Sequence, residues 1–190
     1  MSFFVEVAIM AVQLVFGIAL FVAGLRIILP LSRARFSNPL CQLVYKVTNP
    51  LVGPLSQILP PYRKLSIAAV VLGWLIILVE VCVILLLLGT LPNLLLIPLS
   101  LGGLLYYLLG FAFWAIVIRA IMSFFTVDYS NPAVEVLYAI TDPLLKPFDR
   151  LPPHNVGFNL SPMYAGFAIR VAMLLLTKLF GPYVVLFARL

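Results

Sequence analysis

Charged residues are scarce in this chain of 190 residues, where Asp, Glu, Lys and Arg together make up 9%. A soluble globular domain usually carries about a quarter charged residues. The mean hydropathy is +1.20, and 64% of the residues are hydrophobic. One core cannot bury that much apolar surface, so the composition excludes an ordinary soluble domain and indicates a membrane protein.

Cysteine and histidine are also few. Cys41 and Cys82 form no CxxC pair, and His154 has no Cys or carboxylate at the spacing of metal ligands. No nucleophile and base lie at a spacing typical of catalysis. The net charge of +6 comes from basic residues in short loops, which is a membrane-orientation pattern and not a nucleic-acid one. We therefore predict no metal, no cofactor, no nucleic-acid partner and no enzymatic activity.

Four long apolar runs follow one another along the chain. Each is long enough to cross the hydrocarbon core, which takes about 20 residues. The runs are continuous, whereas the strands of a membrane barrel would alternate. The sequence therefore predicts an all-α membrane protein with four transmembrane helices, at residues 7–25, 65–88, 94–118 and 160–188.

The loops between these runs predict the orientation. The loop between the first and second runs carries six basic residues and no acid, and the loop between the second and third carries no charge. The loop between the third and fourth runs is mixed, and acidic residues count little in the positive-inside rule. We expect both long loops in the cytoplasm and both termini on the opposite side of the membrane.

An internal repeat relates the two halves at a shift of 93 residues. The matches fall on Arg, Asn and Pro, which are minority residues here, so duplication explains them better than composition. We predict two parallel tandem helical hairpins, 1–92 and 93–190. The matched pairs include Arg26 with Arg119, Asn38-Pro39 with Asn131-Pro132, Tyr45 with Tyr138, Thr48 with Thr141, Pro50 with Pro143, and Pro54 with Pro147.

Each long loop contains signals for a short helix. Asn38 and Asn131 are predicted N-caps, each followed by proline at the first helical position. Asn49-Pro50 and Asp142-Pro143 repeat the signal and predict a second short piece. We expect short amphipathic helices at the cytoplasmic interface, with an ordinary cytosolic hairpin as the alternative.

Ionisable residues inside the runs are candidates for function, because they are costly in lipid. Glu80 and Lys178 are expected about 23 and 27 Å from their cytoplasmic entries, with Arg170 at about 15 Å. We predict that Glu80 pairs with Lys178 and joins the two units. An ion or proton pathway and snorkelling to the lipid interface are the alternatives.

Three further positions are expected to have structural roles. Arg26 and Arg119 either anchor the ends of their spans at lipid phosphates or bond the Asn and carbonyl groups of their own loops. Ser161 is expected as an N-cap with Pro162 at the first helical position, not as a nucleophile.

The repeated motif resembles the YggT family, also called YlmG. The pattern is Arg, eleven residues, Asn-Pro, then Tyr-x-x-Thr-(Asp/Asn)-Pro-Leu-x-x-Pro, Leu-Pro-Pro and Leu-Ser-Pro. The second unit fits well, with Asn159 where the family often has Asp before Leu-Ser-Pro. The first unit departs after Pro61, with Lys64-Leu65-Ser66-Ile67 in place of Asp-Leu-Ser-Pro. The resemblance implies a multi-pass protein of the bacterial inner membrane without an established biochemical activity, linked to osmotic or ion homeostasis and, in some relatives, to division or cytochrome assembly.

Two functional hypotheses follow. The first is a structural or assembly protein that organises the membrane through its loop helices. The second is a small transporter or channel affecting ion balance and osmotic stress tolerance, which would need several copies of the chain. The first is favoured because the first and third runs carry almost no polar residues. The expected partners are membrane lipids, with other membrane proteins or further copies of this chain as additional candidates.

Overall fold

The computed structural model describes residues 3–32, 34–125, 128–149, 151 and 160–181. These residues form six helices and no strand. Four helices, α1, α3, α4 and α6, are long and apolar enough to cross a membrane, which confirms the predicted all-α membrane fold. The helices are α1 (Phe3–Ile28), α2 (Pro39–Ile58), α3 (Ile67–Leu87), α4 (Leu96–Met122), α5 (Pro132–Leu145) and α6 (Ser161–Phe180).

The boundaries of the spanning helices differ from the expected ones mainly at α6. It ends at Phe180, where Gly181 has a φ of 82°, a left-handed conformation that cannot continue an α-helix and that glycine adopts without strain. The expected run continued to residue 188, and residues 182–188 lie outside the described part. Lys178 is therefore in the last turn of α6.

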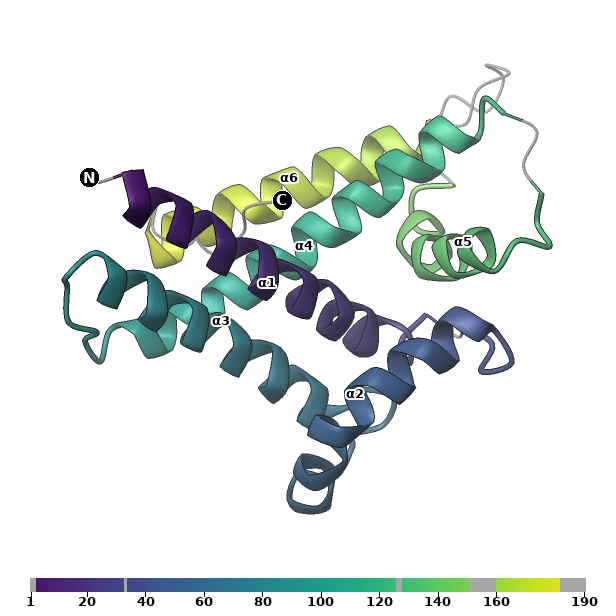
Figure 1. Ribbon diagram of the computed structural model, residues 1–190. Coiled ribbons are helices and arrows are strands. Elements are labelled where there is room, and N and C mark those ends of the chain that lie inside the picture. The colour runs from purple at the N-terminus through teal and green to yellow at the C-terminus, as the bar shows by residue number, and fades with distance from the viewer. Residues whose placement is uncertain (1–2, 33, 126–127, 150, 152–159, 182–190) are drawn as a thin grey trace.

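The two hairpins have the same orientation, because their first helices, α1 and α4, both run toward the end of the bundle that holds α2 and α5 (Figure 1). Within each unit the spanning helices pack together, α1 on α3 and α4 on α6, and α3 also packs on α4 across the units. The loop helices α2 and α5 lie at one end of the bundle, while the start of α1 and the turn between α3 and α4 lie at the other (Figure 1). This arrangement places both long loops at the same end.

Helix α2 is one continuous helix, and the expected break at Asn49-Pro50 is wrong. Pro50 and Pro54 both lie inside it. A proline inside a helix removes the hydrogen bond to the carbonyl four residues earlier. Both prolines are at exposed positions of α2. The carbonyl that each proline leaves without a hydrogen bond lies one turn earlier on the same exposed side of the helix, and not in the protein core. In α5, Pro143 is likewise inside the helix.

The core extends across both units. One cluster of buried side chains combines Leu29, directly after α1, with residues of α2, α4 and α5, including Cys41, Phe111 and Ile140. Close packing between α1, α3 and α4 depends on glycine, because a Cβ at Gly73 would lie 3.3 Å from both Ile27 and Leu104. At this join, Trp74 of α3 donates a 2.8 Å hydrogen bond to the hydroxyl of Ser100 in α4.

Candidate functional site

In the first unit, an arginine at the end of the first span contacts the helix that follows it. Arg26, in the last turn of α1, lies 3.5 Å above the centre of the Tyr45 ring. Its Nη2 donates a 3.2 Å hydrogen bond to the side-chain oxygen of Asn49. A cation over an aromatic face is stabilised by the ring quadrupole. We call Arg26, Tyr45 and Asn49 the first arginine brace.

The second unit repeats this arrangement with an acid. Arg119, in the last turn of α4, lies 4.3 Å above the Tyr138 ring. Its Nη1 donates to the hydroxyl of Thr141 at 2.7 Å and pairs with the carboxylate of Asp142. Arg119, Tyr138, Thr141 and Asp142 form the second arginine brace. Each brace holds the end of a span against the loop helix of its own unit.

The two braces differ in the hydrogen-bond and charge partners that they give to the arginine side chain. Asp142 stands in the second unit where Asn49 stands in the first. The Nε and Nη1 atoms of Arg26 are buried and have no hydrogen-bond partner. Because an unpaired buried donor is costly, the first brace is the less stable of the two.

The loop helices begin where the sequence predicted. The side chain of Asn38 accepts a hydrogen bond from the Leu40 amide at 2.9 Å, and that of Asn131 accepts one from the Ala133 amide at 2.9 Å. Both prolines that follow are in the first turn of their helices. This confirms the two N-caps and explains why α2 and α5 start at equivalent positions.

Asn38 also joins the two units. It is buried, and its amide nitrogen donates to the Pro132 carbonyl at 3.0 Å and to the Glu135 carboxylate at 2.8 Å. Arg35 lies 3.9 Å from the same carboxylate. We call Asn38 and Glu135 the inter-unit joint. Asn131, by contrast, is exposed.

Sequence reasoning missed the aromatic members of the braces. Tyr45 and Tyr138 each follow their arginine by 19 residues, a spacing that was visible in the repeat. A second aromatic ring packs edge-on against each tyrosine, Phe36 at 5.1 Å and Tyr129 at 5.4 Å between centroids. Burial raises the pKa of both brace tyrosines above the ordinary value, so the phenols stay neutral beneath the guanidinium groups at physiological pH.

The buried threonines of the motif bond their own helices. The hydroxyl of Thr48 donates to the Val44 carbonyl at 2.7 Å, and that of Thr141 donates to the Leu137 carbonyl at 2.8 Å. Both are buried. Each threonine lies two residues before a proline inside the helix. Its hydroxyl therefore adds a side-chain hydrogen bond to the turn in which the proline removes a backbone one.

The residues of the Leu-Ser-Pro motif lie at the start of α6. This helix begins at Ser161, with Leu160 at the N-cap and Pro162 in the first turn. The expected N-cap role of Ser161 is therefore off by one residue, because the Ser161 backbone is already helical. The Ser161 side chain is buried.

The intramembrane charges lie on different helices. Glu80 lies on α3, about 10 Å along the helix from its end at Leu87, and Lys178 lies about 3 Å from the end of α6. The main neighbour of α6 is α4. The pairing of Glu80 with Lys178 stays a prediction, as does every functional role assigned to these side chains.

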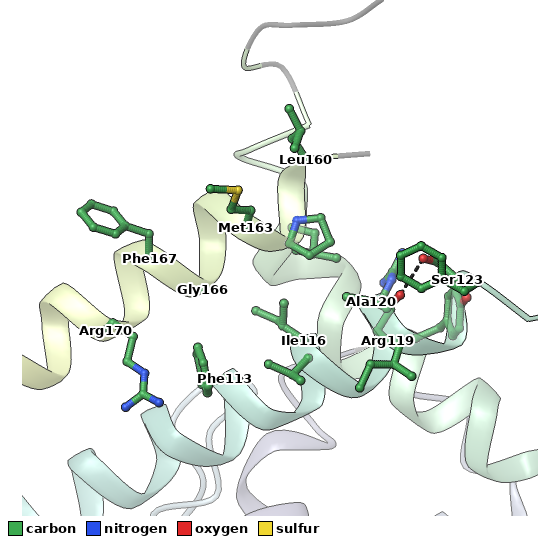
Figure 2. A pocket seen from close by; sticks show the side chains of 16 residues that line it. Phe113, Ile116, Arg119, Ala120, Ser123, Leu160, Met163, Gly166, Phe167 and Arg170 are labelled. Carbon is green, nitrogen blue, oxygen red and sulfur yellow. Dashed lines mark hydrogen bonds between the residues drawn. The ribbon is translucent and has the colours of Figure 1, made fainter. Parts of the chain in front are cut away.

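Arg170 lies in a groove between α4, α5 and α6. Its guanidinium is 4.2 Å from the centre of the Phe113 ring, and the groove has a volume of about 810 Å³. Figure 2 shows Arg170 facing Phe113 at one end of the groove, with Arg119 and Ser123 at the other. Most of the remaining wall is apolar. Among the described residues, no group of three or more His, Cys, Asp and Glu could hold a metal ion.

Comparisons with known proteins agree on one family. A family model described as CCB3/YggT matches residues 5–87 and again 99–180. The chain is 34% identical over 185 residues to an uncharacterized protein of Pseudomonas aeruginosa, covering 90% of this chain and 89% of that protein. It is 34% identical over 143 residues to the uncharacterized protein YggT of Escherichia coli K12, covering 73% and 72%. No solved structure matches.

Proposed function

The chain belongs to the CCB3/YggT family, and from that premise we propose that it is a structural or assembly protein that organises the bacterial inner membrane. Its relatives are described only as uncharacterized, so the proposal is based on the surface of the molecule. We place both long loops in the cytoplasm and both termini in the periplasm, as the basic residues of the first loop favour.

The outer surface of α2 is the observation that carries this proposal. Three stripes run along the helix, beginning at successive residues. The stripe that begins at Leu40 is exposed and apolar. The stripe that begins at Cys41 is buried, and the stripe that begins at Gln42 is exposed and mostly polar. A helix with one face on a bundle, one apolar face free and one polar face free fits the boundary between lipid and water. The exposed apolar stripe consists of Leu40, Leu43, Val47, Leu51 and Ile58.

Helix α5 has no equivalent stripe, since none of its large apolar residues is exposed. The two loop helices therefore have different tasks in this proposal. Helix α5 packs into the bundle, and α2 is the surface that meets lipid or another membrane protein.

A test is to change the α2 stripe without changing the bundle. The double substitution Leu43→Lys and Val47→Lys removes the apolar face, and Gln42→Lys with Ser56→Lys adds the same charge at exposed polar positions of α2 as a control. We expect only the stripe variant to fail to restore growth of a deletion strain under salt stress, at equal protein level in the membrane. If both variants complement equally, the α2 surface is not where the function lies.

A transporter or channel affecting ion balance is the second candidate. One observation favours it, namely that Glu80 and Arg170 are ionisable side chains inside spanning helices. Purified protein in liposomes distinguishes the two functions. Ion flux above that of empty liposomes, removed by Glu80→Gln, would support transport and contradict the structural proposal.

A further inference from the structure

We propose that the groove between α4, α5 and α6 binds one anionic phospholipid, with its phosphate on Arg170 and an acyl chain along the apolar wall. This site is independent of the organising role proposed for α2. It follows from three properties of the groove: its unbalanced charge, its apolar lining and its position along the spans.

Arg170 is the unbalanced charge. Among the described residues, the ion pairs join Arg35 to Glu135 and Arg119 to Asp142, and Arg170 belongs to neither pair. The other arginine of the groove, Arg119, is already paired with Asp142. The described residues of the groove therefore carry one net positive charge, which matches a phosphodiester lipid with a single negative charge.

The Arg170 guanidinium lies over the face of Phe113. A cation–π contact is weaker than the penalty for an uncompensated arginine deep in a span. A phosphate would add charge-assisted hydrogen bonds, which guanidinium forms in a bidentate geometry. In a bilayer, the lipid headgroup is the nearest abundant source of such an anion.

The groove also offers a path for the lipid. Arg119 and Ser123 lie near the end of α4 at Met122, where the headgroups are expected, and Arg170 lies about 13 Å along α6 from Ser161. Figure 2 shows these two ends joined by the walls of the groove, with Ile116 on α4 and Met163 on α6. The long side chain of Arg170 can extend along the groove toward the N-terminal end of α6, where the headgroups are expected. It can thus meet a phosphate that enters at that end, while the acyl chain lies against the apolar side chains.

Gly166 shapes the wall opposite Phe113. A Cβ at this position would lie 3.5 Å from the Phe113 ring, an ordinary contact. Gly166→Ala should therefore leave the groove open, whereas the larger side chain of Gly166→Leu must occupy it. This pair of variants tests the groove without changing any charge.

The experiment uses the full chain reconstituted in vesicles of equal phosphatidylglycerol and phosphatidylcholine, extracted gently and measured by native mass spectrometry. We expect one phosphatidylglycerol to be retained in preference to phosphatidylcholine. Arg170→Gln should reduce this preference about tenfold, as expected for the loss of one charge-assisted contact. Lys46→Gln removes the same charge from the polar face of α2 and should change nothing.

The groove variants complete the test. Gly166→Leu should lose the preference and Gly166→Ala should keep it, with both proteins monodisperse on size exclusion. The proposal is overturned if the wild type shows no preference, if Arg170→Gln behaves like Lys46→Gln, or if Gly166→Leu binds like the wild type. It is also overturned if Phe167→Cys forms disulfide-linked dimers in these vesicles, because a second copy would then occupy the groove.

Discussion

At the scale of single residues, the two arginine braces can be compared directly, because they occupy equivalent places in the two units. The partner of Arg26 is the side-chain amide of Asn49, and the partner of Arg119 is the carboxylate of Asp142. Asn49→Asp should stabilise the protein by about 0.5–1 kcal/mol, since it gives Arg26 an ionised partner at a half-exposed site. Asp142→Asn should destabilise it by about the same amount. Unfolding by SDS in mixed micelles measures both changes.

The control for this exchange is Asn93→Asp, which adds the same charge in the exposed turn between α3 and α4. It should leave the free energy of unfolding nearly unchanged. If Asn49→Asp gains no more than this control, the unpaired nitrogens of Arg26 do not limit stability.

Cys41 gives a second prediction at this scale. It is buried, and burial, followed by the charge of Glu135, raises the pKa of its thiol. Above the ordinary thiol pKa, the unfolded chain ionises while the folded chain stays neutral, so stability falls as pH rises through that window. At pH 8, in a Cys82→Ser background, iodoacetamide should modify Cys41 at least about tenfold more slowly than in denatured protein.

A matched thiol at an exposed position on α2 tests the cause. Ser56→Cys in a chain lacking both natural cysteines should react at nearly the denatured rate. Equal rates for Cys41 and this exposed thiol would show that α2 does not stay packed on the bundle.

The sequence predicted those parts of the candidate site that depend on neighbours in the chain. The caps at Asn38 and Asn131 follow from an Asn-Pro pair alone, so a local pattern is sufficient. The tyrosines under Arg26 and Arg119 depend on the angle at which a loop helix folds back onto a span. That angle is set by packing among four helices, which no local pattern contains.

At the scale of helices, the contact between α4 and α6 depends on Gly102. A Cβ at this position would lie 2.8 Å from Cγ of Phe180, closer than real Cβ contacts. Gly102→Ala should therefore destabilise the protein by about 1–3 kcal/mol, because the ring or the helix must move. Thermal unfolding in detergent measures the effect.

Gly17 is the matched control, since a Cβ there meets nothing within 4 Å. Gly17→Ala should be neutral or stabilise α1 by up to about 1 kcal/mol, through the better helix propensity of alanine. Loss of stability in both variants would mean that crowding at Phe180 is not the cause.

Helices were predictable to different degrees. Long runs with few charged residues are sufficient to predict that all four spans exist. The residues at which the spans begin and end were predicted less accurately. Proline at position 50 predicted a break in α2, yet packing of Cys41, Val44 and Val52 on the bundle keeps the helix continuous through it. Tertiary burial outweighed a local signal there, as it commonly does for helices in proteins.

At the scale of the whole molecule, the two units share the repeated motif but differ in the contacts that its residues make. Asn38 caps α2 and also bonds α5, whereas its counterpart Asn131 caps α5 and is exposed. The two units are thus joined at one end by the inter-unit joint and, between α3 and α4, by the bond from Trp74 to Ser100. The sequence predicted a polar link between Glu80 and Lys178, which stays a prediction, and it did not predict the link between Asn38 and Glu135.

The inter-unit joint can be tested by comparing equivalent asparagines. Asn131→Ala removes only a helix cap, which costs about 1 kcal/mol. Asn38→Ala removes the same cap and also leaves the Glu135 carboxylate without its buried amide donor, so we expect a further loss of about 1 kcal/mol or more. In a double-mutant cycle with Glu135→Ala, this additional loss should appear as coupling between positions 38 and 135, measured by SDS unfolding. A coupling of zero, with Asn38→Ala and Asn131→Ala equal in effect, would mean that the units are held together by their apolar contacts alone.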